Sequence, residues 1–178
     1  MDLDSYLSLF APLNRGLSQT KRTIRGADIS QYLSELLADR LRRHGVELIA
    51  TEAFKEFEVE SYVSTLYPAF VNLVDNAIYW LEHGQHLHSD DARPKQKVIT
   101  LDVIDDALVV SDTGPGILPA DELSVFETGY SRKPGGSGLG LSITKDVLER
   151  EGFRLDLAPY NRDRGATFRI TPPLEDAP

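Results

Sequence analysis

The sequence of 178 residues contains no cysteine. Disulfides and thiolate metal sites are therefore excluded, which fits a reducing compartment, and we expect a cytoplasmic protein. No apolar run approaches the roughly 20 residues that cross a bilayer, so we expect no membrane contact from this chain. The acidic start Met1–Asp4 is not typical of a signal peptide.

Positive charge is scarce, since 19 Lys and Arg stand against 28 Asp and Glu, for a net charge of −9. This balance disfavours nucleic-acid binding driven by overall charge, and we expect no nucleic-acid partner. Hydrophobic residues make up 41% of the chain and charged residues 26%, as in ordinary globular proteins. The length fits one domain with a terminal extension.

Periodicity divides the chain into a helical N-terminal segment (1–44), a mixed α/β domain (45–173) and a disordered tail (174–178). Asp28 or Ser30 is expected to cap a helix that Gly45 ends. Longer helical patterns cover 61–83 and 139–150, and the segment from Thr113 to Ser137 is expected to be a long functional loop. Strands are predicted at 46–49, 54–59, 98–104, 107–111, 153–158 and 166–171, with a turn at Asp105-Asp106.

Asp112 directly follows the apolar strand predicted over 107–111, so its carboxylate lies at a strand end, where ligands commonly dock. The carboxylate can accept a hydrogen bond from an exocyclic amine such as that of adenine. Gly114 and Gly116 let the backbone pass close to a flat base. Taken alone, Asp-Thr-Gly-Pro-Gly favours a surface turn.

Glycines recur over residues 135–141, directly before a predicted helix. They allow backbone N–H groups to approach a phosphate, toward which the helix points its positive N-terminus. The Gly-x-Gly-x-Gly spacing matches neither the Rossmann fingerprint nor a Walker A loop. By itself the segment could equally be a flexible linker.

Asn72 and Asn76 lie four residues apart on the long predicted helix, so their amides share one face. Amide oxygens suit Mg²⁺, which takes few protein ligands alongside phosphates and water. The alternative is that these asparagines only satisfy buried backbone groups.

His83, His86 and His88, with Asp90 and Asp91, invite a metal interpretation. We favour no metal there, because ligands on a polar loop without supporting contacts bind weakly. His83 suits the C-terminal end of the helix through the macrodipole.

Taken in order, these motifs resemble the ATP-binding domain of sensor histidine kinases, type II topoisomerase ATPases, Hsp90 and MutL, the GHKL superfamily with its Bergerat fold. The similarity covers roughly residues 45–172. It implies an α+β fold: a two-layer α/β sandwich with a mixed, mostly antiparallel sheet and helices on one face. The matching segments are the N box (72–77), the G1 box (112–117), the F box (125–133), the G2 box (136–141) and a final strand motif (165–168).

The resemblance implies ATP and Mg²⁺ as ligands and gives roles to matching positions. Asn76 and Asn72 would hold Mg²⁺ and phosphate, Asp112 would bind the adenine amine, and Arg132 and Lys133 would supply cations from the loop. Tyr79 departs from the pattern, because many kinases carry a lysine or another polar residue there. Other nucleotide contacts would come from Gly114, Gly116, Ile117, Tyr130, Gly136, Ser137, Gly138, Leu139, Gly140, Leu141 and Thr167.

Asn72 stands where the hydrolysing branches of the superfamily carry a glutamate that activates water. An amide cannot act as a base, so the sequence favours phosphoryl transfer, with Asn72 the one candidate catalytic position. We expect a histidine-kinase-like catalytic domain. Three alternatives stay open: a conformational ATPase module like that of Hsp90 or MutL, a non-catalytic ATP-binding scaffold, and a serine/threonine kinase of the anti-sigma type.

The phosphoacceptor histidine of such a kinase is expected outside this chain. None of the four histidines lies in a long helix followed by an acidic residue in the expected way: His44, His83, His86 and His88. The acceptor would lie upstream in a longer protein or on another protein, with homodimerisation possible for the full-length form. Leu3–Arg25 resembles the end of the second helix of a dimerisation hairpin.

Overall fold

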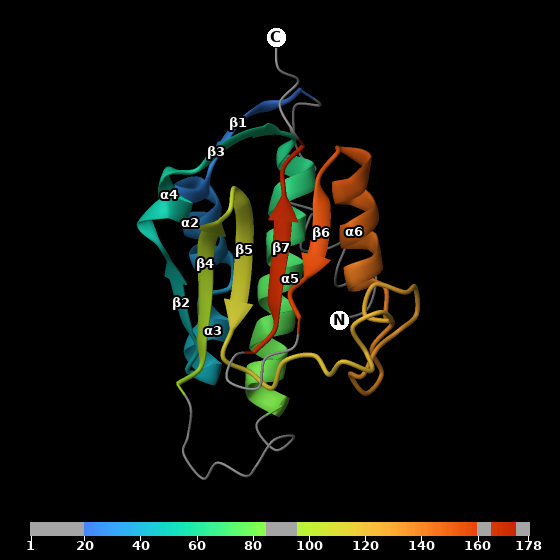
Figure 1. Ribbon diagram of the computed structural model, residues 1–178. Coiled ribbons are helices and arrows are strands. Elements are labelled where there is room, and N and C mark those ends of the chain that lie inside the picture. The colour runs from blue at the N-terminus through green and yellow to red at the C-terminus, as the bar shows by residue number, and fades with distance from the viewer. Residues whose placement is uncertain (1–19, 85–95, 160–164, 174–178) are drawn as a thin grey trace.

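The computed structural model describes residues 20–84, 96–159 and 165–173. Its main element is a five-stranded sheet in the order β2-β4-β5-β7-β6 (Figure 1). The β2–β4 pair is parallel and the other three pairs are antiparallel, so the expected mixed, mostly antiparallel sheet is confirmed. The strands are β2 (Glu47–Ala50), β4 (Val98–Ile104), β5 (Ala107–Asp112), β6 (Arg154–Leu157) and β7 (Thr167–Thr171).

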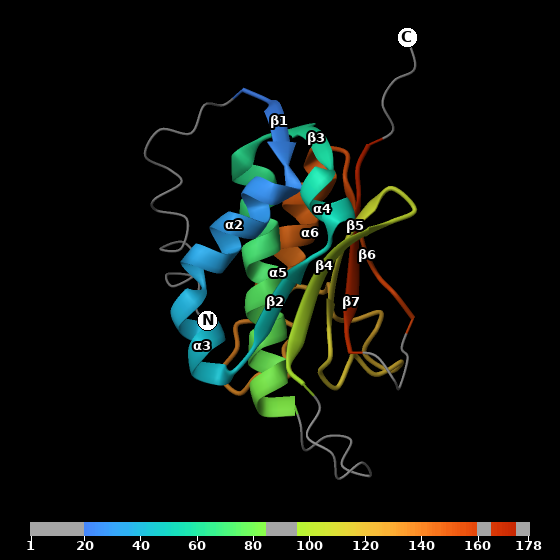
Figure 2. The ribbon, with the colours of Figure 1, turned by 90° about the vertical axis from the view of Figure 1, so that its left-hand side faces the viewer.

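Helices cover one face of this sheet, which confirms the expected two-layer architecture. Figure 2 shows them on one side of the strands, with α5 running along the middle of the layer. The helices are α2 (Gly26–Leu36), α3 (Ala38–His44), α4 (Glu52–Glu56), α5 (Val63–His83) and α6 (Gly140–Arg150). In the described part of the chain, no helix combines the length and apolarity needed to span a bilayer.

The core lies between α5 and the sheet, because the apolar stripe of α5 repeats at helical spacing. Leu66, Phe70 and Leu73 are fully buried or nearly so, against Leu101 and Leu108 of the central strands. Burial of each such side chain stabilises the fold by roughly 1.5–3 kcal/mol. This core fixes the long helix, and with it the side chains of Asn72 and Asn76, relative to the ends of the strands.

The β4–β5 hairpin has the two-residue turn predicted from the sequence. Asp105 and Asp106 both have positive φ, at 49° and 59°. Two consecutive left-handed residues are typical of the tight turn that matches the twist of antiparallel strands. The hairpin therefore sets the register that brings Asp112 to the end of β5, opposite Ile99.

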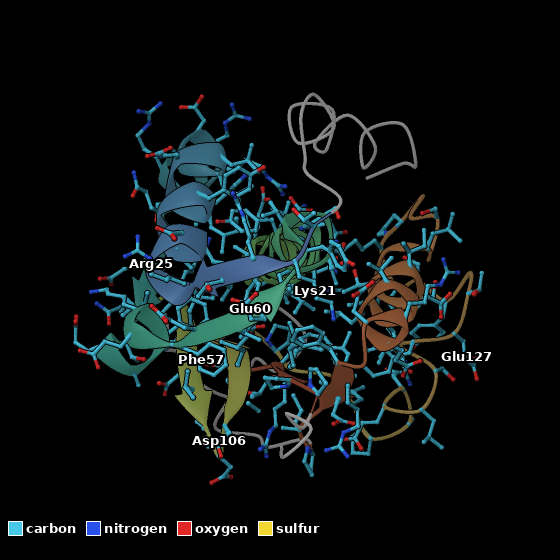
Figure 3. All side chains as sticks on the ribbon, turned by 90° about the horizontal axis from the view of Figure 1, so that it is seen from above. Lys21, Arg25, Phe57, Glu60, Asp106 and Glu127 are labelled. Atoms are coloured by element: carbon cyan, nitrogen blue, oxygen red, sulfur yellow. The ribbon has the colours of Figure 1, made fainter. Side chains whose placement is uncertain are left out.

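A separate two-stranded sheet contradicts one expectation for the N-terminal segment. Arg22–Arg25, expected at the end of a helix, forms β1, which pairs antiparallel with β3 (Glu58–Ser61). Figure 3 shows the two strands side by side, with Arg25, Phe57 and Glu60 along them. Ile24 is buried in the main core, so pairing and burial override the helical pattern. Residues 1–19 and 174–178 lie outside the described residues.

Two boundaries also differ from the sequence prediction. Helix α2 begins at Gly26, so neither Asp28 nor Ser30 caps it, and it is separated from α3 by Leu37 before Gly45 ends the pair. The strand predicted over 54–59 is wrong in its first part, which is the helix α4. The Thr51 side chain caps that helix by accepting a hydrogen bond from the Phe54 amide at 3.2 Å.

Candidate functional site

A cavity of about 230 Å³ lies between α5, the N-terminal end of α6 and the loop of residues 113–137, which we call the lid loop. Figure 1 shows this loop passing from the end of β5 to the start of α6. All the side chains and glycines predicted to contact nucleotide line the cavity, apart from Gly114 and Thr167. Segments separated by up to about a hundred residues thus meet at one site.

Asp112 forms one end of the cavity and is held by backbone donors. Its Oδ1 accepts hydrogen bonds from the Gly114 amide at 2.7 Å and the Ala166 amide at 3.2 Å. Burial raises the pKa of the Asp112 carboxyl to about 6, against the lowering effect of those two amides. A side chain at Gly165 would collide with the same carboxylate, so glycine is required there. Gly114 therefore acts by fixing Asp112, away from the cavity surface.

The two asparagines of α5 lie in a different polar network at the other end. Asn72 is buried and donates from Nδ2 to the Thr144 hydroxyl of α6 at 2.9 Å. Its Oδ1 accepts from Asn76 Nδ2 at 3.5 Å. A Cβ at Gly140 would lie 2.8 Å from Asn72 Oδ1, so the glycine lets the N-terminus of α6 approach α5 closely. Asn72 thus joins the two helices, while Asn76 lies nearer the open cavity.

Lys133 of the lid loop reaches the same asparagine face. Its Nζ donates to Asn76 Oδ1 at 2.6 Å and lies 4.5 Å from the centroid of the Tyr79 ring. Burial lowers the pKa of Lys133 to about 8, and the nearby charge of Arg40 lowers it further in the same direction. The Asn76 carbonyl oxygen is therefore oriented toward a cation.

Arg132, the other expected phosphate cation, is held within the lid loop. Its Nη2 lies 2.8 Å from Asp121 Oδ1, and its Nε donates to the Tyr130 hydroxyl at 3.2 Å. The hydrogen bond from Tyr130 and the charge of Arg132 lower the pKa of the Asp121 carboxyl. Arg132 and Tyr130 both line the cavity, but their polar atoms serve this internal cluster.

Comparison with known proteins identifies the family. The family described as "Histidine kinase-, DNA gyrase B-, and HSP90-like ATPase" matches residues 62–176, well over half of the chain. The chain belongs to this family. The match contains the α5 asparagines, Asp112, the lid loop and the glycine-rich start of α6, which all contribute to the lining of the cavity.

Curated relatives of the ATPase domain are bacterial signalling proteins. The "signal transduction histidine-protein kinase/phosphatase MprB" of Mycolicibacterium vanbaalenii is 31% identical over 158 residues, which covers 85% of this chain and 31% of the relative. The MprB of Mycobacterium leprae is 32% identical over 161 residues, covering 85% and 29%. The chain thus spans about 30% of the length of the curated relatives it matches.

Solved structures support the same fold. A mycobacterial sensor histidine kinase MprB structure superposes with a TM-score of 0.62 at 28% identity, covering 85% of this chain and 95% of that one. The catalytic domain of histidine kinase ThkA gives a TM-score of 0.65 at 20% identity, covering 86% and 96%. The ThkA similarity, at this identity, bears on the fold alone.

Several residues at the cavity or beside it were missed from the sequence. Arg40 of α3 lies outside the part that resembles the family, yet it forms an ion pair with Asp75, which lines the cavity. Trp80 follows Asn76 by four residues, and this spacing on one helix face could have placed it at the site. Asp121 gave no sequence signal, because its partner Arg132 is eleven residues away in an irregular loop.

Thr167 and His83 do not line the cavity. Thr167 pairs with Ser111 in the sheet, and its neighbours Ala166 and Phe168 line the cavity instead. His83 Nδ1 lies 3.0 Å from the Tyr79 carbonyl at the end of α5. The residues 85–95, including His86, His88, Asp90 and Asp91, lie outside the described residues. Within the described residues, no group of three or more His, Asp or Glu could hold a metal ion.

Proposed function

We propose that this chain is the ATP·Mg²⁺-binding catalytic domain of a histidine kinase, which transfers the γ-phosphoryl group to a histidine outside this chain. The observation that carries the proposal is the two-ended cavity. A buried carboxylate with fixed backbone partners lies at one end, and an asparagine oxygen that already accepts a cation lies at the other. The kinase names of the relatives support the same assignment.

The Asp112 end suits an adenine base. The carboxylate can accept a hydrogen bond from the exocyclic amine, while guanine presents a carbonyl oxygen at the equivalent position. Ile117 and Phe168 supply apolar walls beside it. Because Asp112 Oδ1 is already bonded to two amides, its orientation needs no rearrangement on binding. This argues for adenine over guanine nucleotides.

Asn76 is suited to bind Mg²⁺ directly. Asn72 is suited to support that site, whether or not its own oxygen contacts the metal. Mg²⁺ takes oxygen ligands, usually from few protein groups together with phosphates and water. Asn76 Oδ1 already accepts the Lys133 ammonium, whereas Asn72 donates its amide to Thr144 and so holds its oxygen toward Asn76. Bound Mg²⁺ would neutralise charge on the phosphates during transfer.

The phosphates would lie between Lys133 and the N-terminus of α6. Helix α6 has eleven residues and begins at Gly140, so its free N–H groups face the glycine-rich segment that lines the cavity. Ser137 and Gly138 bring backbone amides to the same wall. These groups position the γ-phosphoryl for attack and stabilise its charge, which is the principal work in such transfers.

Phosphoryl transfer is favoured over ATP hydrolysis by Asn72. This buried amide has no capacity to accept a proton from water, and it is committed to Thr144. A conformational ATPase of the Hsp90 or MutL kind would need another base to activate water. No observation favours a non-catalytic scaffold or a serine/threonine kinase, so these alternatives stay secondary.

The acceptor histidine and the dimerising segment are proposed to belong to the rest of a longer protein, in accord with the partial coverage of the MprB relatives. A kinase that draws on cellular ATP would act in the cytoplasm, as expected from the cysteine-free sequence. We propose homodimerisation for that longer form.

The test is calorimetric titration of the 178-residue chain with a non-hydrolysable ATP analogue, with and without Mg²⁺, and with the matching GTP analogue. We expect binding strengthened by Mg²⁺ and absent or much weaker for the guanine analogue. Equal binding of both analogues, or no binding of either, would contradict the proposal. Transfer of label from [γ-³²P]ATP to the histidine-bearing segment of an MprB relative, in an acid-labile form, would test the kinase step.

A further inference from the structure

The ammonium of Lys133 is a partly buried charge with a like charge nearby. Burial and the charge of Arg40 both lower the pKa of Lys133, while Arg40 itself is paired with Asp75. Among the described residues, no carboxylate forms an ion pair with Lys133. The contacts that hold this cation in the cavity wall are the Asn76 oxygen at 2.6 Å and the Tyr79 ring at 4.5 Å.

The Tyr79 ring is well placed for such a contact. Tyr79 follows Asn76 by three residues on α5, so the amide oxygen and the ring lie side by side on one helix face. His83 stacks on the ring with 4.2 Å between centroids and an interplanar angle of 18°, and Trp80 packs against its edge. The ring orientation is therefore fixed by aromatic neighbours on the same helix, independently of the lid loop.

A ring face can hold an ammonium without using up an oxygen ligand. An asparagine oxygen that binds Mg²⁺ can no longer hold a lysine at 2.6 Å, because two cations would crowd one atom. The quadrupole of an aromatic ring attracts the same ammonium without competing for that oxygen. Lys133 could therefore remain beside the cavity when Asn76 turns to the metal.

We propose that Tyr79 is a positioning residue: its ring seats the ammonium of Lys133 beside Asn76, so that this lid-loop cation faces the nucleotide phosphates. The inference rests on the proposed nucleotide site. It gives a role to Tyr79, whose ring here holds a lysine that comes from the lid loop, 57 residues along the chain from Asn76.

The experiment is a double-mutant cycle on the 178-residue chain, measured by calorimetry. The variants are Tyr79→Leu, Lys133→Met and the double variant, each titrated with Mg²⁺ and a non-hydrolysable ATP analogue and, separately, with adenosine. Tyr79→Phe keeps the ring and is the matched control. Tyr79 is only partly buried, so its replacement leaves the core intact, and thermal melts verify this.

We expect Tyr79→Leu to weaken triphosphate binding by roughly 3- to 30-fold, the range of a cation–π contact, while Tyr79→Phe binds like the parent. The double variant should bind no more weakly than Lys133→Met alone, because the ring acts only through the lysine. Adenosine affinity should stay unchanged in every variant, since adenosine carries no phosphate.

Three results would overturn the inference. The losses of triphosphate affinity could be additive in the double variant, or Tyr79→Leu could bind the triphosphate like the parent. Tyr79→Leu could also lose as much affinity for adenosine as for the triphosphate, which would mean that Tyr79 only shapes the cavity. Failure of the proposed function has a separate signature. In that case the parent chain itself binds neither ligand.

Discussion

The two ends of the cavity are built in different ways. The Asp112 end is made by adjacent strands, with both partners of the carboxylate supplied by backbone amides. The Asn76 end is made by side chains from α5, α6 and the lid loop, and the Lys133–Asn76 contact joins residues 57 positions apart. Backbone partners in a sheet hold one geometry, while long side chains on a loop can take several.

Under the proposed function, this contrast separates recognition from chemistry. The rigid end would select the base before the phosphates are engaged, and the adjustable end would rearrange around Mg²⁺ and the moving phosphoryl group. Ligands that contact one end only, such as adenosine, should therefore divide variants into two classes. Variants at the Asp112 end should weaken adenosine and triphosphate alike, and variants at the Asn76 end should weaken the triphosphate alone.

The largest effect is expected from Asp112→Asn. Replacing the carboxylate by an amide puts a donor in reach of the adenine amine, and we expect about 10- to 100-fold weaker binding of both adenosine and the triphosphate, as for loss of a charged hydrogen bond. Calorimetry measures both affinities. The matched control is Asp106→Asn at the exposed β4–β5 turn, which should bind like the parent. Undiminished adenosine affinity in Asp112→Asn would remove Asp112 from the base site.

The same variant should be more stable than the parent. The pKa of Asp112 is about 6 in the fold against 3.8 for the ordinary group, so folding favours the neutral form, and the stability contributed by this group is lost as the pH rises from about 3.8 to about 6. An asparagine oxygen still accepts from both amides, and we expect a gain of about 1–3 kcal/mol in unfolding free energy at pH 7.5. Urea unfolding should show this gain shrinking toward pH 5, where the parent becomes protonated. An unchanged gain at both pH values would assign it to another cause.

The next largest loss of triphosphate affinity is expected from removal of the Asn76 amide. In Asn76→Ala the proposed Mg²⁺ ligand is lost, and we expect the triphosphate affinity measured with Mg²⁺ to fall by roughly tenfold, to the level measured without it, as for loss of one charge-assisted contact. Paired titrations with and without Mg²⁺ measure the difference. Adenosine is the internal control and should bind as in the parent. A Mg²⁺ enhancement that survives the substitution would place the ion elsewhere.

A change of similar size in adenosine affinity is expected from a change of pH, which acts at the Asp112 end of the cavity. Since the adenine amine favours the ionised carboxylate, binding releases the proton that Asp112 holds below pH 6. Adenosine affinity should therefore be complete above that pKa and fall by about tenfold from pH 7 to pH 5. Adenosine is used because a terminal phosphate would titrate in the same range. The Asp112→Asn variant should show a flat profile, and a parallel decline in both chains would exclude Asp112 as its origin.

The Asp112 end was also the more predictable one from the sequence. An apolar strand followed by Asp112, two glycines and a tight turn is local information, and each part acts within a few residues. The helical stripe of α5 likewise required only its own periodicity. The prediction failed at Arg22–Arg25 and over 54–56, where the conformation depends on pairing with a distant strand and on the Thr51 cap.

The Asn76 end was predicted as a set of residues but not as an arrangement. The sequence pattern placed Asn72, Lys133 and Arg132 at the site, yet the partners of Asn72 and Lys133 lie far along the chain. Thr144 is 72 residues from Asn72, and Arg40 belongs to an element outside the recognised motifs. Only folding shows that Lys133 reaches Asn76 while Arg132 turns toward Asp121.

A smaller effect is expected from loss of the hydrogen bond between Asn72 of α5 and Thr144 of α6. Thr144→Val keeps the shape of the side chain but leaves the buried Asn72 amide without its acceptor, which should lower the unfolding free energy by about 1–2 kcal/mol. Chemical denaturation measures it, and Thr144→Ser, which retains the hydroxyl, is the matched control. Equal losses in both variants would show that the methyl packing matters and the hydrogen bond does not.

The smallest change in triphosphate affinity is expected for the Arg132–Asp121 pair, and it distinguishes Arg132 from Lys133, the other cation of the lid loop. Arg132 is exposed and paired with the buried Asp121, so we expect Asp121→Asn and Arg132→Met each to weaken triphosphate binding by only about two- to threefold, as for an ion pair with one partner in solvent. Both effects should shrink in high salt, because salt screens the solvent-exposed guanidinium. If Arg132 contacts phosphate directly, Arg132→Met will instead lose as much affinity as Lys133→Met, while Asp121→Asn will release the guanidinium and strengthen binding. The sign of the Asp121→Asn change therefore decides whether Arg132 braces the lid loop or serves the nucleotide.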